Sequence, residues 1–222
     1  MLKKIASIYV LSISMLSVMV SNAAVPNTYI SVQLGYASTH MKDKTNIAAI
    51  WDATKTLFTA DGGAINLSNN GLAGRLAVGY QFNQHFTIEM GYLQLSKKKI
   101  NGDSYRTPAS ISLNQRAIDL TGKAILLITN NLNMYGKLGA AYLTTKIDGK
   151  RYRNNNTVTT YDLNGAADIT QHKWAPETTV GVSYEITPSV SIDTSWLHIQ
   201  LIGKNRPGNI DFVAVGVDYN FD

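Results

Sequence analysis

Four histidines are the side chains best suited to acid–base or nucleophilic chemistry here, because the chain contains no cysteine. A histidine with a serine two residues further on could activate that hydroxyl as a nucleophile. Around His198 the sequence reads WLHIQ, so that serine is missing; His40 and His172 lie at the bases of expected loops, and His85 in a short turn. No His/Asp cluster has the spacing of metal ligands. We therefore expect no enzymatic activity, no metal and no cofactor.

Seven charged residues form a second group that could do chemistry, because each stands alone among small or polar residues. If their positions face an interior, opposite charges must pair there, since an unpaired buried charge is costly. We interpret the group first as a static plug and second as a narrow ion path. The expected interior charge network consists of Arg75, Glu89, Asp119, Lys123, Lys137, Glu177 and Asp193.

Eight segments with strict apolar–polar alternation must position these charges, and helical periodicity is nearly absent after residue 25. A period of two is typical of β-strands, and each segment is near the ~9–11 residues with which a tilted strand crosses a bilayer. The segments cover residues 30–37, 72–82, 86–92, 118–126, 134–142, 174–184, 190–196 and 213–221.

The apolar face of these segments is aliphatic in the middle and aromatic at both ends. A soluble β-sandwich or a lipocalin-like barrel would also alternate, but its outer face would carry charges throughout, whereas here the polar face is mostly Gly, Ala, Ser and Thr. Two aromatic girdles around an aliphatic band are typical of a lipid-facing barrel surface. The girdle residues are Tyr36, Tyr80, Phe82, Tyr92, Tyr142, Trp174, Tyr184, Trp196, Tyr219 and Phe221.

The connections between segments alternate long and short. Long connections at 39–71, 96–114 and 145–172 are each followed by a turn of about five residues or fewer, and the last gap, 199–209, is intermediate. Short periplasmic turns and long external loops alternate in this way in outer-membrane barrels. The barrel must close, because an open edge would leave backbone groups unpaired in hydrocarbon. The sequence predicts an all-β, eight-stranded, antiparallel up-and-down transmembrane β-barrel.

The N-terminus carries the pattern of a secretory signal peptide. Lys3 and Lys4 precede an apolar run from Ile5 to Val20, and small residues follow up to Ala24. The run is shorter than a membrane-anchor helix needs, and a cleavage-like site follows it directly. We expect residues 1–23 to be the signal peptide, residues 24–222 to be the barrel domain, and the mature protein to lie in the outer membrane of a Gram-negative cell.

Several stretches in the same order and spacing resemble the transmembrane domain of small outer-membrane proteins of the OmpA and OmpX type. They are LGY at 34–36, AVGYQF at 77–82, EMGY at 89–92, PETTVGVSYEITP at 176–188 and VGVDYNF at 215–221. The resemblance spans residues 28–221 and implies a barrel-only member without a peptidoglycan-binding domain. It also implies recognition of the C-terminal strand by the barrel assembly machinery, although Asp222 follows the aromatic Phe221.

Basic residues concentrate in the expected external loops. The formal net charge is +5, and removal of Lys3 and Lys4 leaves +3. Lys and Arg suit phosphate groups, so we expect contact with outer-membrane lipids and lipopolysaccharide, or with a host or surface ligand. A structural and cell-surface interaction role, adhesion included, is the first hypothesis; a narrow pore is the second, a lipid A-modifying enzyme the third, and nucleic acid is excluded. The basic loop residues are Lys97, Lys98, Lys99, Arg106, Lys150, Arg151, Arg153, Lys204 and Arg206.

Overall fold

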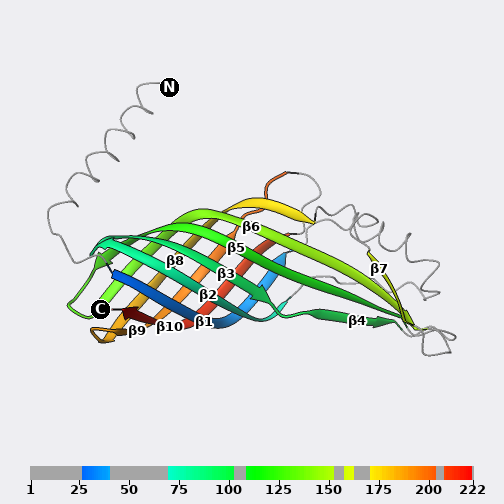
Figure 1. Cartoon of the computed structure of the whole chain (residues 1–222), viewed down its shortest axis with the longest axis horizontal. Coiled ribbons are helices and arrows are strands. Elements are labelled where there is room, and N and C mark those ends of the chain that lie inside the picture. Colours follow the sequence, from blue (N-terminus) through cyan, green and yellow to red (C-terminus); the bar gives the residue numbers. More distant parts are fainter. Residues whose placement is uncertain are drawn as a thin grey trace, which may run out of the picture.

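A computed structural model describes residues 27–40, 70–102, 109–152, 158–162, 171–203 and 208–221, all of which belong to strands or to the connections beside them (Figure 1). The expected signal peptide lies outside the described residues. The strands are β1 (Asn27–His40), β2 (Asn70–Asn83), β3 (Phe86–Leu95), β4 (Lys98–Gly102), β5 (Ala109–Leu127), β6 (Leu132–Tyr152), β7 (Val158–Asp162), β8 (His172–Thr187), β9 (Val190–Ile199) and β10 (Asn209–Phe221).

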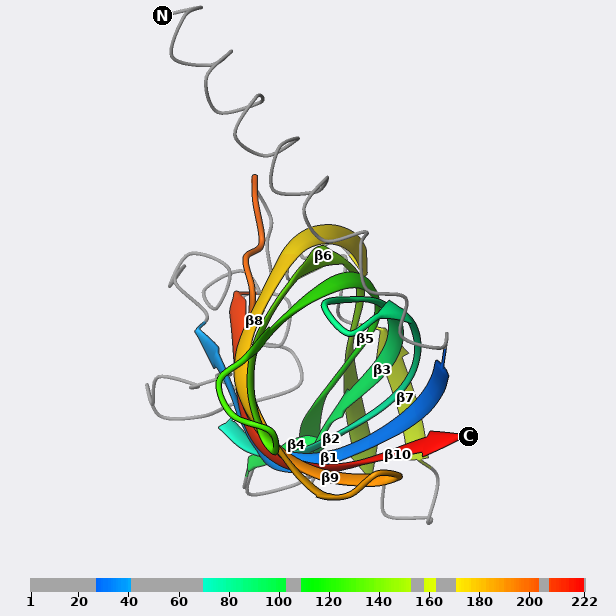
Figure 2. The same ribbon diagram turned by 90° about the vertical axis from the view of Figure 1, so that its left-hand side faces the viewer.

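Eight of these strands close into a barrel, as predicted. Antiparallel neighbours follow the chain from β1 through β2, β3, β5, β6, β8 and β9 to β10, and β1 pairs with β10 to complete the ring (Figure 2). That last pairing runs from Thr28 opposite Phe221 to His40 opposite Asn209. Within the described ranges, no helix is long and apolar enough to cross a membrane.

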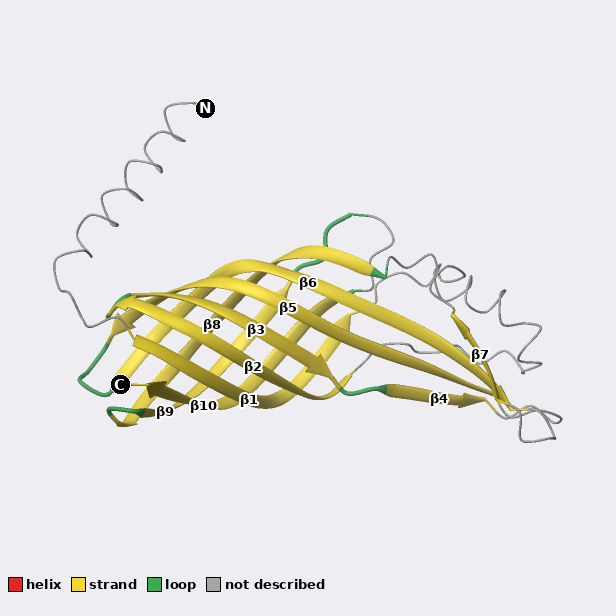
Figure 3. Cartoon of the chain, in the orientation of Figure 1, coloured by secondary structure: helices red, strands yellow, loops and turns green. Residues whose placement is uncertain are grey.

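The two ends of the barrel differ. At one end, which we call the turn end, short turns join β2 to β3, β5 to β6 and β8 to β9. At the other, the loop end, the chain makes its longer connections, and β5 and β6 continue beyond the ring (Figure 3). The prediction was wrong here in one respect: residues 109–114 and 145–152, expected as loop, are paired strand.

The overhanging parts of β5 and β6 form a small sheet outside the ring. β4 pairs with β5 along residues 98–102, and β7 pairs with β6 along residues 158–162. These short strands also lie in segments expected as loops. The β5–β6 register continues without a shift from the turn to Ala109 opposite Arg151, so one uninterrupted hairpin serves both the barrel wall and the extension.

Alternation places one face of every barrel strand outside and the other in the lumen. Large apolar side chains such as Leu76, Met90 and Leu138 are exposed on the outer face, whereas Ala77, Glu89 and Lys137 are buried inside. Two inward glycines make room for aromatic rings: a Cβ at Gly79 would collide with the ring of Tyr29, and a Cβ at Gly181 with that of Tyr135. The lumen is therefore filled by side chains, as in other eight-stranded barrels.

Candidate functional site: the barrel lumen and the loop-end rim

Ion pairs occupy the middle of the lumen, where four of the seven predicted network residues meet. Arg75 Nη1 lies 2.8 Å from Glu89 Oε1, and Arg75 Nη2 lies 2.6 Å from Asp119 Oδ1. Lys137 Nζ, from β6 two strands away, approaches Glu89 Oε1 to 2.6 Å. The side chains involved are at most 3% exposed, so Glu89 links two bases away from water.

Neutral side chains complete this network, and alternation alone did not identify them. The Tyr29 hydroxyl donates to Glu89 Oε2 at 2.5 Å. The Tyr135 hydroxyl donates to Asp193 Oδ2 at 2.6 Å, and Gln33 Nε2 donates to the same oxygen at 2.9 Å. The signal in the sequence was an inward-facing tyrosine that has an inward-facing glycine directly opposite on the next strand. We call the network residues together with these three partners the polar layer.

The remaining charges of the lumen are less well paired. Lys123 makes no ion pair among the described residues; its Nζ lies 4.4 Å from the ring centroid of Tyr135 and 5.1 Å from that of Tyr29. Neither carboxylate oxygen of Glu177 has a hydrogen-bond partner in the described part of the chain. Asp218, which was left out of the predicted network, is also buried. All seven predicted residues therefore lie inside the barrel, but they do not form one continuous chain of contacts.

Most buried side chains in the loop-end half of the lumen are apolar, which the alternation did not predict; Thr39, Gln115 and Thr145 are buried polar exceptions, and the Thr39 hydroxyl donates to Gln115 Oε1 at 3.1 Å. Leu93, Leu197 and Phe212 face the lumen, as the charged residues on the same strands do. They are at most 2% exposed and belong to one buried apolar cluster. A buried cluster of aliphatic and aromatic side chains fills the space between the polar layer and the loops. We call it the apolar layer: Ala37, Ala73, Leu93, Leu95, Ala117, Ala141, Leu143, Ala175, Leu197, Ile199, Leu201, Ile210, Phe212 and Ala214.

At the turn end, the lumen opens into a polar cavity of about 270 Å³. Lys123 and Asp218 line it together with turn residues such as Gln84 and Asn130. The polar layer is therefore continuous with an opening at this end, whereas the apolar layer separates it from the other end.

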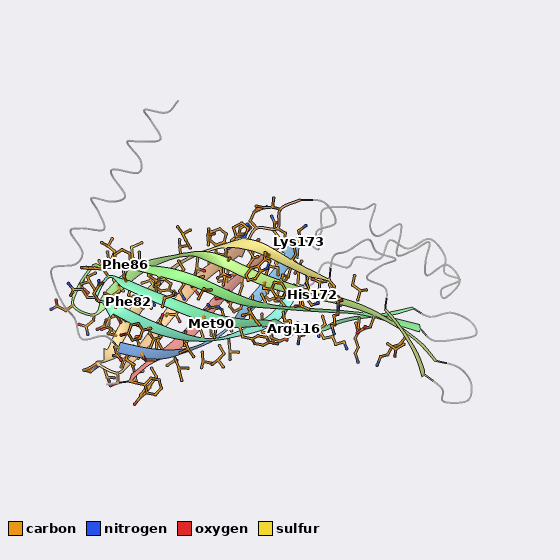
Figure 4. The ribbon with its side chains drawn as sticks, turned by 45° about the horizontal axis from the view of Figure 1, so that its top comes forward. Phe82, Phe86, Met90, Arg116, His172 and Lys173 are labelled. Carbon is orange, nitrogen blue, oxygen red and sulfur yellow. The ribbon has the colours of Figure 1, made fainter. Side chains whose placement is uncertain are left out.

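The predicted girdle residues all lie on the outer face of the barrel. Nine are exposed, and Tyr142 is half-buried because it stacks on His172 at 5.6 Å and contacts Trp174 at 5.0 Å between ring centroids. At the turn end, Tyr80 meets Phe82 and Tyr219 meets Phe221 edge to face. In Figure 4, Phe82 and Phe86 lie at the turn end, Met90 lies midway, and Arg116, His172 and Lys173 lie toward the loop end.

At the loop-end rim, His198 contacts two polar side chains. His198 Nδ1 lies 2.7 Å from Asp211 Oδ1, and its Nε2 lies 3.1 Å from Gln200 Oε1. The same Asp211 oxygen accepts the indole N–H of Trp196 at 3.1 Å. Both ring nitrogens of His198 are thus engaged by acceptor side chains. The side chain of His40 lies outside the description.

The structure describes only part of the predicted basic set. Lys97 and Lys99 are exposed beside and within β4, and Lys150 is half-buried on β6. Lys98 and Arg151 lie in β4 and β6, but their side chains are outside the description, as are Arg106, Arg153, Lys204 and Arg206 entirely. Two further bases at this end, Arg116 and Lys146, are exposed and were not singled out.

Several known proteins are similar to this chain. An uncharacterized protein of Coxiella burnetii is 26% identical over 223 residues, which cover 90% of this chain and 88% of that protein. Among solved structures, the N-terminal β-barrel domain of Pseudomonas aeruginosa OprF is 10% identical with a TM-score of 0.48, covering 90% of this chain and all of that one. Neisserial surface protein A is 14% identical with a TM-score of 0.47 and the same coverage.

The attachment invasion locus protein Ail of Yersinia pestis, solved with the heparin analogue sucrose octasulfate, is also similar. It is 15% identical, with a TM-score of 0.46, and the match covers 87% of this chain and 99% of Ail. A family model for the OmpA-like transmembrane domain matches residues 23–222. The turn end is therefore periplasmic, the loop end is extracellular, and this chain is an integral outer-membrane protein that belongs to the OmpA-like transmembrane domain family.

Proposed function

We propose that this protein is a closed, non-conducting barrel that holds a rigid β-sheet extension and basic side chains at the cell surface, where they contact lipopolysaccharide or an external anionic ligand. The observation that carries the first half is the apolar layer. An ion that crossed it would lose most of its hydration and gain few polar contacts, and hydrophobic constrictions of this kind stop conduction by dewetting.

Single-channel recording of the refolded protein in a planar bilayer tests this proposal. We expect the wild-type barrel to be silent once its folding has been verified by heat-modifiable gel mobility. The double variant Leu93→Ser, Phe212→Ser places hydroxyls and space in the apolar layer, so discrete conductance steps are expected from it. Reproducible steps from folded wild-type protein would overturn the proposal.

A narrow pore is the second candidate function, and one feature favours it. The polar layer opens to the periplasm through the cavity beside Lys123, and Glu177 has no hydrogen-bond partner among the described residues. A pore would require the apolar layer to move aside. Wild-type steps whose size changes in Glu89→Gln or Lys137→Met would identify the polar layer as the conducting path and would make this candidate the function.

Surface contact is supported by the position of the exposed bases. Lys97, Lys99 and Lys146 belong to the β4–β5–β6 extension or to its base, at the extracellular end. Exposed cations there attract phosphate or sulfate groups, and the attraction weakens with salt because it is screened within about 10 Å at 0.1 M. We also propose that the barrel assembly machinery binds β10, the C-terminal strand, whose Phe221 is exposed.

A charge-reversal variant tests the surface contact. Lys97→Glu, Lys99→Glu, Lys146→Glu should weaken binding to lipopolysaccharide aggregates by about tenfold or more, because six units of charge change at one end. The matched control Thr129→Glu, Asn130→Glu, Asn131→Glu adds acids at the periplasmic end and should bind like the wild type. Equal lipopolysaccharide binding by both variants would show that these basic residues do not make the surface contact.

We further propose that the protein is not an enzyme. The one described His–Asp pair, His198 with Asp211, has its second ring nitrogen on Gln200, so no ring nitrogen is left to accept a proton from a hydroxyl. The lipid A of cells that overproduce the protein should match that of cells with an empty vector by mass spectrometry. A new deacylated or acylated species would refute this expectation.

A further inference from the structure

A shallow apolar groove of about 710 Å³ crosses the lipid-facing surface of the barrel over β5, β6, β8 and β9 as far as β10. Its exposed lining is almost entirely hydrocarbon. Trp196 and Val213 bound it near the extracellular end, and Leu126 and Met134 bound it near the periplasmic end. Its periplasmic part lacks large side chains, because Ala124 and Gly136 lie there.

The strand register explains the shape of the groove. Ala124 is paired with Gly136, Gly136 with Val180, Val180 with Trp196, and Trp196 with Val213, so these five residues form a single row across five strands. Four strand spacings make that row about 19 Å long. Strands of such barrels tilt by about 35–45° from the barrel axis, so a row perpendicular to them climbs obliquely from the periplasmic side to the extracellular side.

A parallel row forms one wall. Leu126, Met134, Val182 and Thr194 are successive partners on the periplasmic side of the first row. The only hydroxyl among them, on Thr194, donates to the carbonyl oxygen of Ala214 at 3.1 Å, so the wall presents hydrocarbon.

The floor is low because two small residues stand at the periplasmic end of the first row. Ala124 contributes one methyl group. Gly136 contributes no side chain, and a Cβ there would find its nearest heavy atom, the carbonyl oxygen of Thr179, only at 3.9 Å. The space above Gly136 is thus open and is not filled by a neighbouring side chain.

We propose that this groove seats a single hydrocarbon chain of a phospholipid from the periplasmic leaflet. The groove is continuous with the established lipid interface, because large apolar side chains on the same strands, such as Val180 and Val213, are exposed to the membrane. An acyl chain that lies in it buries apolar surface against both the floor and the wall, compared with one side elsewhere, and burial is favourable in proportion to packed contact.

The two ends of the groove decide which leaflet supplies the chain. The periplasmic end lies beside Thr129, Asn130 and Asn131, which are exposed and neutral and can hydrogen-bond to a phospholipid headgroup. At the extracellular end, the Trp196 indole donates to Asp211, whose carboxylate is paired with His198, so this pair offers no surplus positive charge to the phosphates of lipopolysaccharide.

Native mass spectrometry of the full mature chain tests the proposal. The protein is refolded in vesicles of palmitoyl-oleoyl phosphatidylethanolamine and phosphatidylglycerol, extracted into a mild detergent, and its retained phospholipids are counted. We expect one retained phospholipid on the wild type. Gly136→Leu fills the groove and should reduce the singly lipidated fraction by about tenfold, since the chain loses its deepest contacts.

Gly122→Leu is the matched control. Gly122 is also an outward glycine, its Cβ would have open space to 4.0 Å, and it lies outside the groove. This variant should retain the phospholipid like the wild type. Ala124→Leu, which fills the same row, replaces Gly136→Leu if the latter fails the gel-mobility test of folding.

Three results would overturn the proposal. They are a folded wild type without a retained phospholipid, equal retention by the wild type and the groove-filled variant, and equal loss in the Gly122→Leu control. A competition arm with lipopolysaccharide in the vesicles addresses the source of the chain. Retention of lipopolysaccharide by the wild type and its loss in Gly136→Leu would show that the extracellular leaflet fills the groove, which contradicts the assignment made here.

Discussion

The two halves of the lumen solve the same packing problem with opposite chemistry. In the polar layer, Glu89 is bound by Arg75, Lys137 and Tyr29, so each buried charge depends on specific partners. In the apolar layer, Leu93 and Phe212 depend only on shape and volume. The polar half lies at the open periplasmic end, and the apolar half lies below the extracellular extension. The barrel therefore keeps its charges where water is near and seals the end that faces the outside.

The largest expected effect comes from breaking the polar layer. Glu89→Ala leaves Lys137 without an ion-pair partner and should destabilise the folded barrel by about 3–5 kcal/mol, as for other buried pairs from which one partner is removed. Urea unfolding in lipid vesicles, followed by tryptophan fluorescence, measures this change. The matched control is Glu177→Ala, which removes an equally buried acid without a hydrogen-bond partner in the described residues. Equal losses in both variants would mean that pairing does not distinguish the two acids.

A single truncation in the apolar layer should destabilise the folded barrel somewhat less than Glu89→Ala. Leu93→Ala removes methylene contacts and leaves a cavity, for an expected loss of about 2–5 kcal/mol in the same unfolding experiment. The loss should be independent of salt concentration, in contrast to charge-dependent effects. A loss for Leu93→Ala that changed with salt concentration would show that charges contribute to the apolar layer.

The outer face provides a test of which side of each strand is the lumen. Leu76→Arg places a charge on the lipid-facing surface and should cost about 2–4 kcal/mol near the bilayer midplane. The residue before it, Arg75, carries a charge that faces the lumen, where Glu89 and Asp119 pair with it. Unchanged assembly and stability of Leu76→Arg, judged by gel mobility and unfolding midpoint, would reverse the assignment of faces.

The smallest expected effect is a difference in unfolding free energy between variants of the two buried lysines, Lys123 and Lys137. Among the described residues, Lys123 makes ring contacts but no ion pair, so Lys123→Met should cost about 1–2 kcal/mol, the range of a desolvated cation–π contact. Lys137→Met should cost more, because it removes one of the two ion-pair partners of Glu89. The difference between the two unfolding free energies is the measurement, and a larger loss for Lys123→Met would show that the ring contacts outweigh the ion pair.

Alternation was sufficient to predict the barrel from the sequence, because in lipid the outward face must be apolar wherever a strand crosses. It was also sufficient to place Glu89 and Lys137 inside, since inward parity and a lone charge coincide there. It did not place Leu93 and Phe212 in the lumen, because an apolar side chain suits both the lumen and the membrane-facing surface. Only parity along the whole strand could have found them.

Strand boundaries at the extracellular end were also beyond the sequence analysis. Residues 109–114 and 145–152 contain Ser, Asn, Thr and Lys, which are common in loops, so composition favoured a loop. The structure pairs them because the β5–β6 hairpin continues in register past the membrane, where backbone hydrogen bonding no longer requires an apolar face. The contacts of Gln33 and Tyr135 with Asp193 bring three strands together and could not be read from any single strand.

Closure of the ring by β1 and β10 has a consequence for how quickly the protein folds. The pair Thr28–Phe221 joins residues at opposite ends of the strand order, so this contact has nearly the greatest sequence separation that the chain allows. Chain-entropy costs make such contacts slow to form. Until the β1–β10 contacts form, the 13 residues of each strand that pair in the folded barrel lie on an open edge. Such an edge is a template for aggregation. We therefore expect the final step of refolding to be rate-limiting and sensitive to protein concentration.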